Sequence, residues 1–264
     1  MRGSPEDRLL ILLVAAAVLT PGLARAGAWV PRQGHSALDL SLSVLPGATD
    51  ARGPLEPFLN AGAYAYLETG LLAGRLAGLV QAPLHVVNVL PRTEEVRSGL
   101  GDLRVGVRLG LAEGAAPVAA ELWARLPTGI GGGTLPTGFG TFGGAAAFFA
   151  GRSWADGRWV QGGVTAELLA DLGWALRLEL AHGLSLSERW SLDGTLLFRF
   201  AFGVRGGPPG RVLYRGDERW GALNLRARYR VSEGLAVYFG ADLGLVSHNA
   251  PKGIPVVGGL SARW

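Results

Sequence analysis

Residues 99–111 read GLGDLRVGVRLGL, and this segment alternates between two kinds of side chain. Asp102, Arg104 and Arg108 share one parity, whereas leucine and valine occupy the other parity from Leu103 onward. Successive side chains of a β-strand point to opposite faces, so a period of two predicts a strand with one charged and one apolar face. The fold then depends on what the apolar face contacts, which is either a soluble core or lipid.

The same alternation returns along most of the chain, in segments close to the roughly 9 to 11 residues that a tilted strand needs to cross a bilayer. About twelve segments follow this pattern: 38–44, 61–69, 77–89, 103–111, 117–126, 144–153, 158–168, 172–182, 190–200, 223–231, 237–245 and 255–264. Their uniform length favours a membrane barrel, because the two packed sheets of a soluble sandwich gain nothing from it.

The links between these segments alternate between short and long. The short turns fall at 72–75, 113–114, 155–157, 187–188 and 232–234, and the long links at 46–60, 90–99, 127–143, 203–218 and 248–254. Only the link near Asp171 departs from this order. Outer-membrane barrels have short periplasmic turns, longer extracellular loops and an even number of strands, so the sequence predicts an all-β fold, a transmembrane antiparallel up-and-down β-barrel of about 12 strands.

In such a barrel the polar parity faces the lumen. The side chains expected there carry both signs of charge: Asp39, Gln81, His85, Asp102, Arg104, Arg108, Glu121, Arg125, Glu167, Arg177, Glu179, Asp193, Arg199, Arg226, Arg228 and Arg230. The candidate selectivity residues among them are Asp102, Arg104, Arg108, Arg226, Arg228 and Arg230. This mixture fits a selective polar channel and also a lumen plugged by salt bridges, and the sequence leaves both alternatives open.

The glycine-rich link 127–143 is expected to be an extracellular loop. Folded inward, it would constrict the pore, with Phe139 and Phe142 as apolar contacts for a solute. The alternative is a disordered surface loop. A phosphate-binding loop is excluded, because the segment has no lysine and no helix behind it.

Both ends of the chain carry export features. Residues 1–26 have the order of a secretory signal peptide, with cleavage expected after Ala26, which leaves residues 27–264 as the barrel. The chain has no cysteine, so it has neither a disulfide framework nor a lipid-carrying cysteine. The last alternating strand ends on Trp264, an aromatic terminus that resembles the signal read by the outer-membrane barrel assembly machinery. The expected location is the bacterial outer membrane.

Six other tryptophans lie near predicted strand ends and are expected to form interfacial girdles: Trp29, Trp123, Trp154, Trp159, Trp190 and Trp220.

Other function classes find little support. The four histidines are His35, His85, His182 and His248, and none has a serine placed two residues later on the same strand face, as a barrel lipid hydrolase would need. The expectation is therefore a protein that is not an enzyme, with no catalytic residues. No His/Asp/Glu spacing suggests a metal or another cofactor, and no basic cluster with interleaved aromatics suggests nucleic acid.

Four motifs resemble a known family. Gly99–Asp102 (GLGD) opens a strand, residues 122–129 (LWARLPTG) end the next one, and Glu68–Leu71 (ETGL) and Gln81–Leu84 (QAPL) lie upstream. In order and spacing, over residues 60–145, they resemble the outer-membrane transporter-like family named for the meta-pathway of phenol degradation.

The resemblance implies a barrel that passes small, often hydrophobic or aromatic, molecules across the outer membrane, with lipid and a small solute as partners. A structural or adhesive barrel with a plugged lumen is the alternative.

Overall fold

The computed structural model describes residues 28–49, 55–72, 75–170, 172–202, 213, 218–248 and 250–264. The expected signal peptide, residues 1–26, lies outside them.

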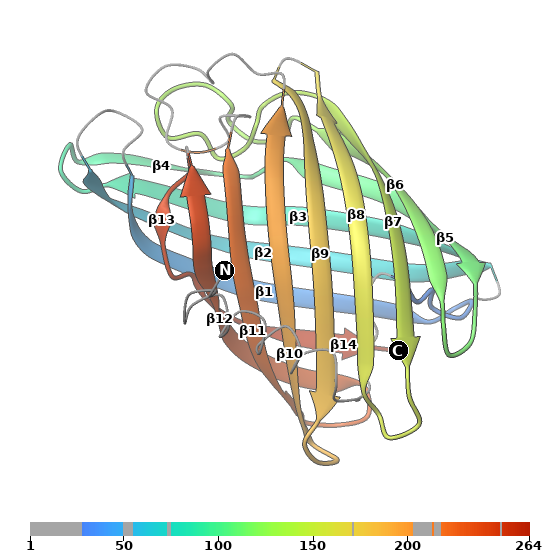
Figure 1. Cartoon of the computed structure of the whole chain (residues 1–264). Coiled ribbons are helices and arrows are strands. Elements are labelled where there is room, and N and C mark those ends of the chain that lie inside the picture. Colours follow the sequence, from blue (N-terminus) through green and yellow to red (C-terminus); the bar gives the residue numbers. More distant parts are fainter. Residues whose placement is uncertain are drawn as a thin grey trace, which may run out of the picture.

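Within the described residues, 12 long antiparallel strands close into a barrel. They are β1 (Ser36–Thr49), β2 (Glu56–Leu72), β3 (Leu76–Leu90), β5 (Leu103–Ala112), β6 (Val118–Leu126), β7 (Gly143–Ser153), β8 (Trp159–Leu169), β9 (Gly173–Ser185), β10 (Trp190–Phe202), β11 (Arg219–Arg230), β12 (Leu235–His248) and β14 (Val256–Arg263). Each strand pairs with its neighbours in sequence, and β1 pairs with both β2 and β14 (Figure 1). The predicted all-β barrel is confirmed.

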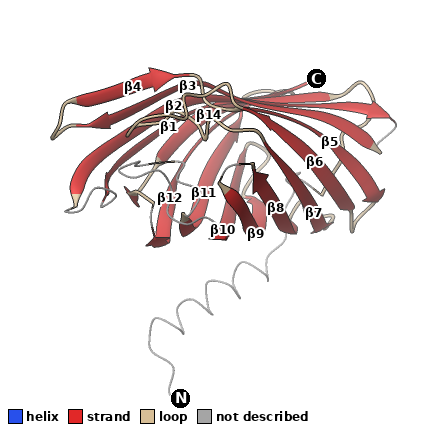
Figure 2. Ribbon diagram, turned by 90° about the horizontal axis from the view of Figure 1, so that it is seen from above, coloured by secondary structure: helices blue, strands red, loops and turns tan. Residues whose placement is uncertain are grey.

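Seen from above, β1 to β4 lie along one side of the barrel and β7 to β12 along the other (Figure 2). The exchange of backbone hydrogen bonds between Ser36 and Trp264 completes the seam between the first and last strands. Closure leaves no unpaired strand edge in the wall, as a barrel exposed to lipid requires.

Two expected loops contain short strands. Within link 90–99, β4 (Glu95–Gly99) pairs with the outer end of β3, and within link 248–254, β13 (Lys252–Gly253) pairs with β1. The wall therefore continues beyond the predicted strands at the end that carries the long loops.

Alternation along β5 follows the prediction. Val105, Val107 and Leu109 are 36% to 47% exposed on the outer face, whereas Arg108 is 5% exposed in the lumen. No helix in the described ranges is long and apolar enough to cross a membrane.

A β-bulge in β3 reverses its alternation. Ala63 pairs with His85 and Tyr64 with Pro83, so Leu84 has no partner across the ladder. Before the bulge the odd-numbered residues face inward, and after it the even-numbered ones do, because an extra residue shifts the pleat by one position. His85 is consequently exposed, and the prediction that it faces the lumen is wrong.

Four of the six expected girdle tryptophans lie inside the barrel instead. Trp159 is 4% exposed and packs edge to face against Trp29, with ring centroids 6.1 Å apart. Trp123 donates a hydrogen bond to the buried Glu121, and Trp220 lines a lumen cavity. Position near a strand end does not define which face a side chain takes. The pleat turns the rings of Trp123, Trp159 and Trp220 inward, whereas Trp29 lies in the segment before β1.

Trp190 is the girdle tryptophan that faces outward, where it packs on Tyr229. Trp174 and Phe202 stack on the same outer surface at the other end of the barrel. Trp154 lies at the turn between β7 and β8, beside Arg152.

Glycines make room for two of the inward rings. A Cβ on Gly183 would approach Trp159 Nε1 to 2.0 Å, and one on Gly106 would approach the Trp123 ring to 2.7 Å. Each glycine pairs across the ladder with the tryptophan that covers it, so ring and glycine fill the lumen together.

Candidate functional site

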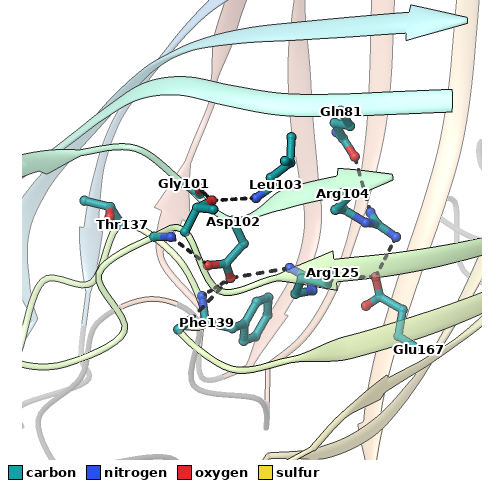
Figure 3. A network of polar contacts seen from close by, with 12 residues as sticks. Gln81, Gly101, Asp102, Leu103, Arg104, Arg125, Thr137, Phe139 and Glu167 are labelled. Carbon is teal, nitrogen blue, oxygen red and sulfur yellow. Dashed lines mark hydrogen bonds and ion pairs between the residues drawn. The ribbon is translucent and has the colours of Figure 1, made fainter. Parts of the chain in front are cut away.

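The carboxylate of Asp102 holds the long loop between β6 and β7. It accepts hydrogen bonds from the backbone N–H groups of Gly129 at 3.1 Å, Phe139 at 2.6 Å and Gly140 at 3.3 Å (Figure 3). Arg125 lies 3.9 Å from the same carboxylate, and Asp102 is 4% exposed. Asp102, which was predicted to be a selectivity residue, therefore has the contacts of a residue that anchors this loop.

The same loop is packed against the barrel along its length. Thr137 is completely buried and donates to the Leu100 carbonyl at 2.6 Å, while the Asn88 amide donates to the Pro136 carbonyl at 2.7 Å. Leu135 is buried in an apolar cluster with strand residues. The loop therefore has a defined structure, and the alternative of a disordered surface loop is wrong.

The two phenylalanines of the loop point to opposite sides of the barrel wall. The ring of Phe139 lies inside the barrel, with the guanidinium carbons of Arg125 and Arg199 at 4.6 and 5.9 Å from its centroid. Phe142 is 63% exposed and shares the parity of the outward residues of β7. The structure thus brings Phe139, and not Phe142, to the place where a constriction is expected.

Arg108 is the centre of a first lumen cluster. Its guanidinium contacts Glu121 at 2.7 Å, Glu68 at 2.7 Å and the Tyr66 hydroxyl at 3.2 Å, and it donates to the Trp29 carbonyl at 3.0 Å. Nε, Nη1 and Nη2 all have partners. These contacts offset the cost of burying the charge and leave Arg108 unsuited to free anion binding.

Glu167 is the centre of a second lumen cluster. Its carboxylate lies 3.5 Å from Arg104, 3.4 Å from Arg125 and 3.4 Å from Arg199. Arg104 also contacts Gln81 at 3.4 Å (Figure 3) and lies 5.2 Å from the centroid of the Trp123 ring. One carboxylate thus contacts three guanidinium groups, and two of these, Arg125 and Arg199, also reach Asp102 and Glu218.

The three arginines of β11 face the lumen as expected but are not free. Arg226 pairs with Asp242 at 2.5 Å, and Arg228 lies 4.0 Å from Asp193. Arg230 donates to a backbone carbonyl at the β9–β10 turn. These contacts agree with the salt-bridged alternative for this part of the wall.

Sequence reasoning missed the segment that precedes β1. Ala28 is 1% exposed, and its backbone N–H donates to Gln161 Oε1 at 2.7 Å inside the barrel. Trp29 follows, packed near Ala147 and Phe149. The segment therefore occupies the lumen, and no alternation or motif marks it, because its partners lie far away in the sequence.

Cavities remain at both ends of the lumen. At the end with the short turns, cavities of about 450 and 830 Å³ are lined by residues including Glu179, Arg228 and Arg108. At the end with the long loops, a cavity of about 710 Å³ is lined by residues including Phe139 and Glu167. The Arg108 and Glu167 clusters thus border cavities at opposite ends.

The described residues contain no group of three or more His, Asp or Glu side chains placed to hold a metal ion.

No protein-family model and no curated protein sequence matches the chain. Among solved structures, an outer membrane channel from Pseudomonas putida F1 is similar over 93% of this chain and 100% of that chain, with a TM-score of 0.71 and 15% identity. This likeness shows a shared fold, that of an outer-membrane β-barrel. Membership of the phenol meta-pathway family stays a prediction.

Two further barrels are similar at a lower level. The translocator domain of the autotransporter NalP from Neisseria meningitidis has a TM-score of 0.48 and 10% identity, over 98% of this chain and 95% of that chain. An anion-selective porin from Comamonas acidovorans has a TM-score of 0.41 and 8% identity, over 87% of this chain and 98% of that chain.

Proposed function

We propose that this protein is an outer-membrane channel for the passive passage of small, hydrophobic or aromatic molecules. The observation that carries the proposal is the pair of cavity systems at the two ends of one lumen, bordered by polar side chains. A passage through the barrel requires these two ends to become connected. The proposal assigns no catalytic step and no cofactor to the chain.

Two parts of the lumen regulate such a passage. Phe139 lies on the Arg125 and Arg199 guanidinium groups and lines one cavity, and the segment around Trp29 borders another. Phe139 belongs to the loop between β6 and β7 and Trp29 to the segment before β1, so both can move without breaking the barrel ladder. The structure then corresponds to a closed channel.

The proposed location is the outer membrane. Export requires the signal peptide of residues 1–26, and assembly requires the aromatic terminus at Trp264. The band of exposed leucine, valine and aromatic side chains on the outer face supports contact with lipid.

A structural barrel with a plugged lumen is the second candidate function. The observation that favours it is the complete pairing of Arg108, because a buried and satisfied ion network resists opening.

Conductance of the purified protein in planar bilayers separates these functions. For a channel, we expect single-channel events, and we expect Phe139→Ala to increase both conductance and the uptake of a small aromatic solute into liposomes. Phe142→Ala is the matched control, since its side chain points outward from the same loop. A folded barrel that gives no conductance in the wild type and in both variants would identify a plugged barrel.

A further inference from the structure

We propose that the cavity at the long-loop end is a binding site for a small aromatic monocarboxylate, whose carboxylate is held by Arg177 and Arg199 and whose ring packs on Trp220. That this molecule is also the transported solute rests on the proposed channel function, whereas the binding itself does not.

The register of three strands places these side chains in one row. Arg199 of β10 pairs across the ladder with Arg177 of β9 on one side and with Trp220 of β11 on the other. Neighbouring strands lie about 4.8 Å apart, and side chains at paired positions point to the same face. Two guanidinium groups and an indole ring are therefore adjacent on one wall of the cavity, and all three line it.

The two arginines have unused hydrogen-bonding capacity. Arg177 reaches Thr165 Oγ1 at 3.4 Å and Glu179 at 3.9 Å, both long contacts, and its Nε has no partner in the described part of the chain. Arg199 binds Glu167 and Glu218 at 3.4 Å each, yet its Nη2 also has no partner among the described atoms. Buried donors are normally satisfied, so two unpaired N–H groups on neighbouring guanidiniums point to a missing acceptor.

A carboxylate supplies the acceptor that this pair lacks. Its two oxygens match two adjacent guanidinium groups, and charge-assisted hydrogen bonds of this kind are stronger than neutral ones. The Arg177 side chain is 29% exposed and lines the cavity, so an incoming anion reaches the side chain there, and the buried Nε has to turn toward it.

The rest of the cavity selects an organic anion over an inorganic one. Leu45, Leu197 and Phe139 line it together with Trp220, and these side chains offer contacts for an aromatic ring and none for a hydrated ion. Of its described lining residues, four are basic and three acidic, which suits a single negative charge. Its volume of about 710 Å³ admits one or two rings with some water.

Isothermal titration of the purified, detergent-solubilised barrel tests the site, with benzoate as the probe. We expect benzoate to bind about tenfold or more tightly than benzamide, which keeps the ring and loses the charge. Acetate, which keeps the charge and lacks the ring, is expected to bind at least about tenfold more weakly than benzoate. Equal binding of benzoate and benzamide, or no heat of benzoate binding, would overturn the proposal.

Variants locate the site. Arg177→Met is expected to weaken benzoate binding about tenfold or more, Trp220→Leu by a smaller factor, and Arg177→Lys to retain part of the affinity. Arg152→Gln is the matched control, because Arg152 is exposed on the outer face of β7 and its replacement is expected to leave binding unchanged. Heat-modifiable migration checks that each variant is a folded barrel, and unchanged binding by a folded Arg177→Met barrel would contradict the assignment.

Bilayer conductance of the same preparations separates this inference from the proposed function. Benzoate binding without conductance would support the site and refute the channel. Conductance without benzoate binding would refute the site and leave the channel standing.

Discussion

Asp102, directly before β5, and Arg108, within it, share the inward parity, yet their contacts differ. Asp102 binds backbone N–H groups of a loop, whereas Arg108 binds carboxylates of β2 and β6. Alternation in the sequence identifies the face of both residues, because the period of two depends on one strand alone. It cannot identify their partners, because these depend on the register between distant segments.

Replacing Asp102 tests its role as the loop anchor. Asp102→Ala removes the acceptor of three backbone N–H groups in a buried site, and we expect the free energy of unfolding to fall by about 2–4 kcal/mol. We also expect conductance to rise, because the loop that carries Phe139 is released. Urea unfolding in detergent and single-channel recording measure the two effects.

The matched control for this change is Asp156→Ala. Asp156 pairs with Arg158 at 2.6 Å in an exposed turn, with 51% of its side chain accessible. Exposed pairs contribute little, so the expected loss is below about 1 kcal/mol. An equally small loss for Asp102→Ala would show that the loop holds its place without this carboxylate.

A charge exchange tests the pairing of Arg226 with Asp242. Arg226→Asp places two carboxylates side by side in a mostly buried position, and we expect a loss of about 2–4 kcal/mol. Adding Asp242→Arg restores the pair in reverse and is expected to recover more than half of that loss. Arg230→Asp, at the exposed end of the same strand, is the control, with an expected loss below about 1 kcal/mol. A double variant no more stable than Arg226→Asp would show that the two residues are not coupled.

The same holds for whole elements: a strand's own residues predict its two faces, but they do not predict its contacts with distant segments. Both faces of β5 follow from its own residues, but the bulge in β3 depends on how Pro83 and Leu84 fit against β2 and reverses the faces from His85 onward. The segment before β1 is the extreme case. Ala28 contacts Gln161, 133 residues away, and no local signal encodes such a contact.

Removing this segment tests whether it restricts the lumen. A chain that lacks residues 28–31 but keeps residues 1–27 for export loses no strand residue, so we expect a folded, heat-modifiable barrel. The Trp29 ring and its contact with Trp159 disappear, and we expect a higher single-channel conductance than that of the wild type. Trp29→Gly is a smaller change with the same expected direction. Unchanged conductance in both folded variants would mean that the segment does not limit flow.

At the scale of the whole molecule, strand number and closure could be predicted because each strand carries its own alternation and each connector its own length. The extensions β4 and β13 could not be predicted, since both are short and depend on pairing with strands that are already in place. The inward tryptophans have a different cause. Trp123 shares the parity of Glu121 and Arg125, and Trp159 shares that of Glu167, so alternation within each strand places these rings in the lumen, whereas nearness to a strand end defines no face.

Orientation in the membrane is a property of the whole barrel, and two glycines offer suitable positions to test it. Gly132 lies in the loop between β6 and β7, Gly114 lies in the short turn between β5 and β6, and a Cβ on either would meet no atom within 4 Å. Outer-membrane barrels place their short turns in the periplasm, so a protease site inserted at Gly132 is expected to be cut in intact cells and one at Gly114 to be spared. Permeabilising the outer membrane should then expose the site at Gly114, which controls for its accessibility to the protease. Cleavage at Gly114 and protection at Gly132 in intact cells would reverse the orientation, and would place the Arg177 and Arg199 cavity on the periplasmic side.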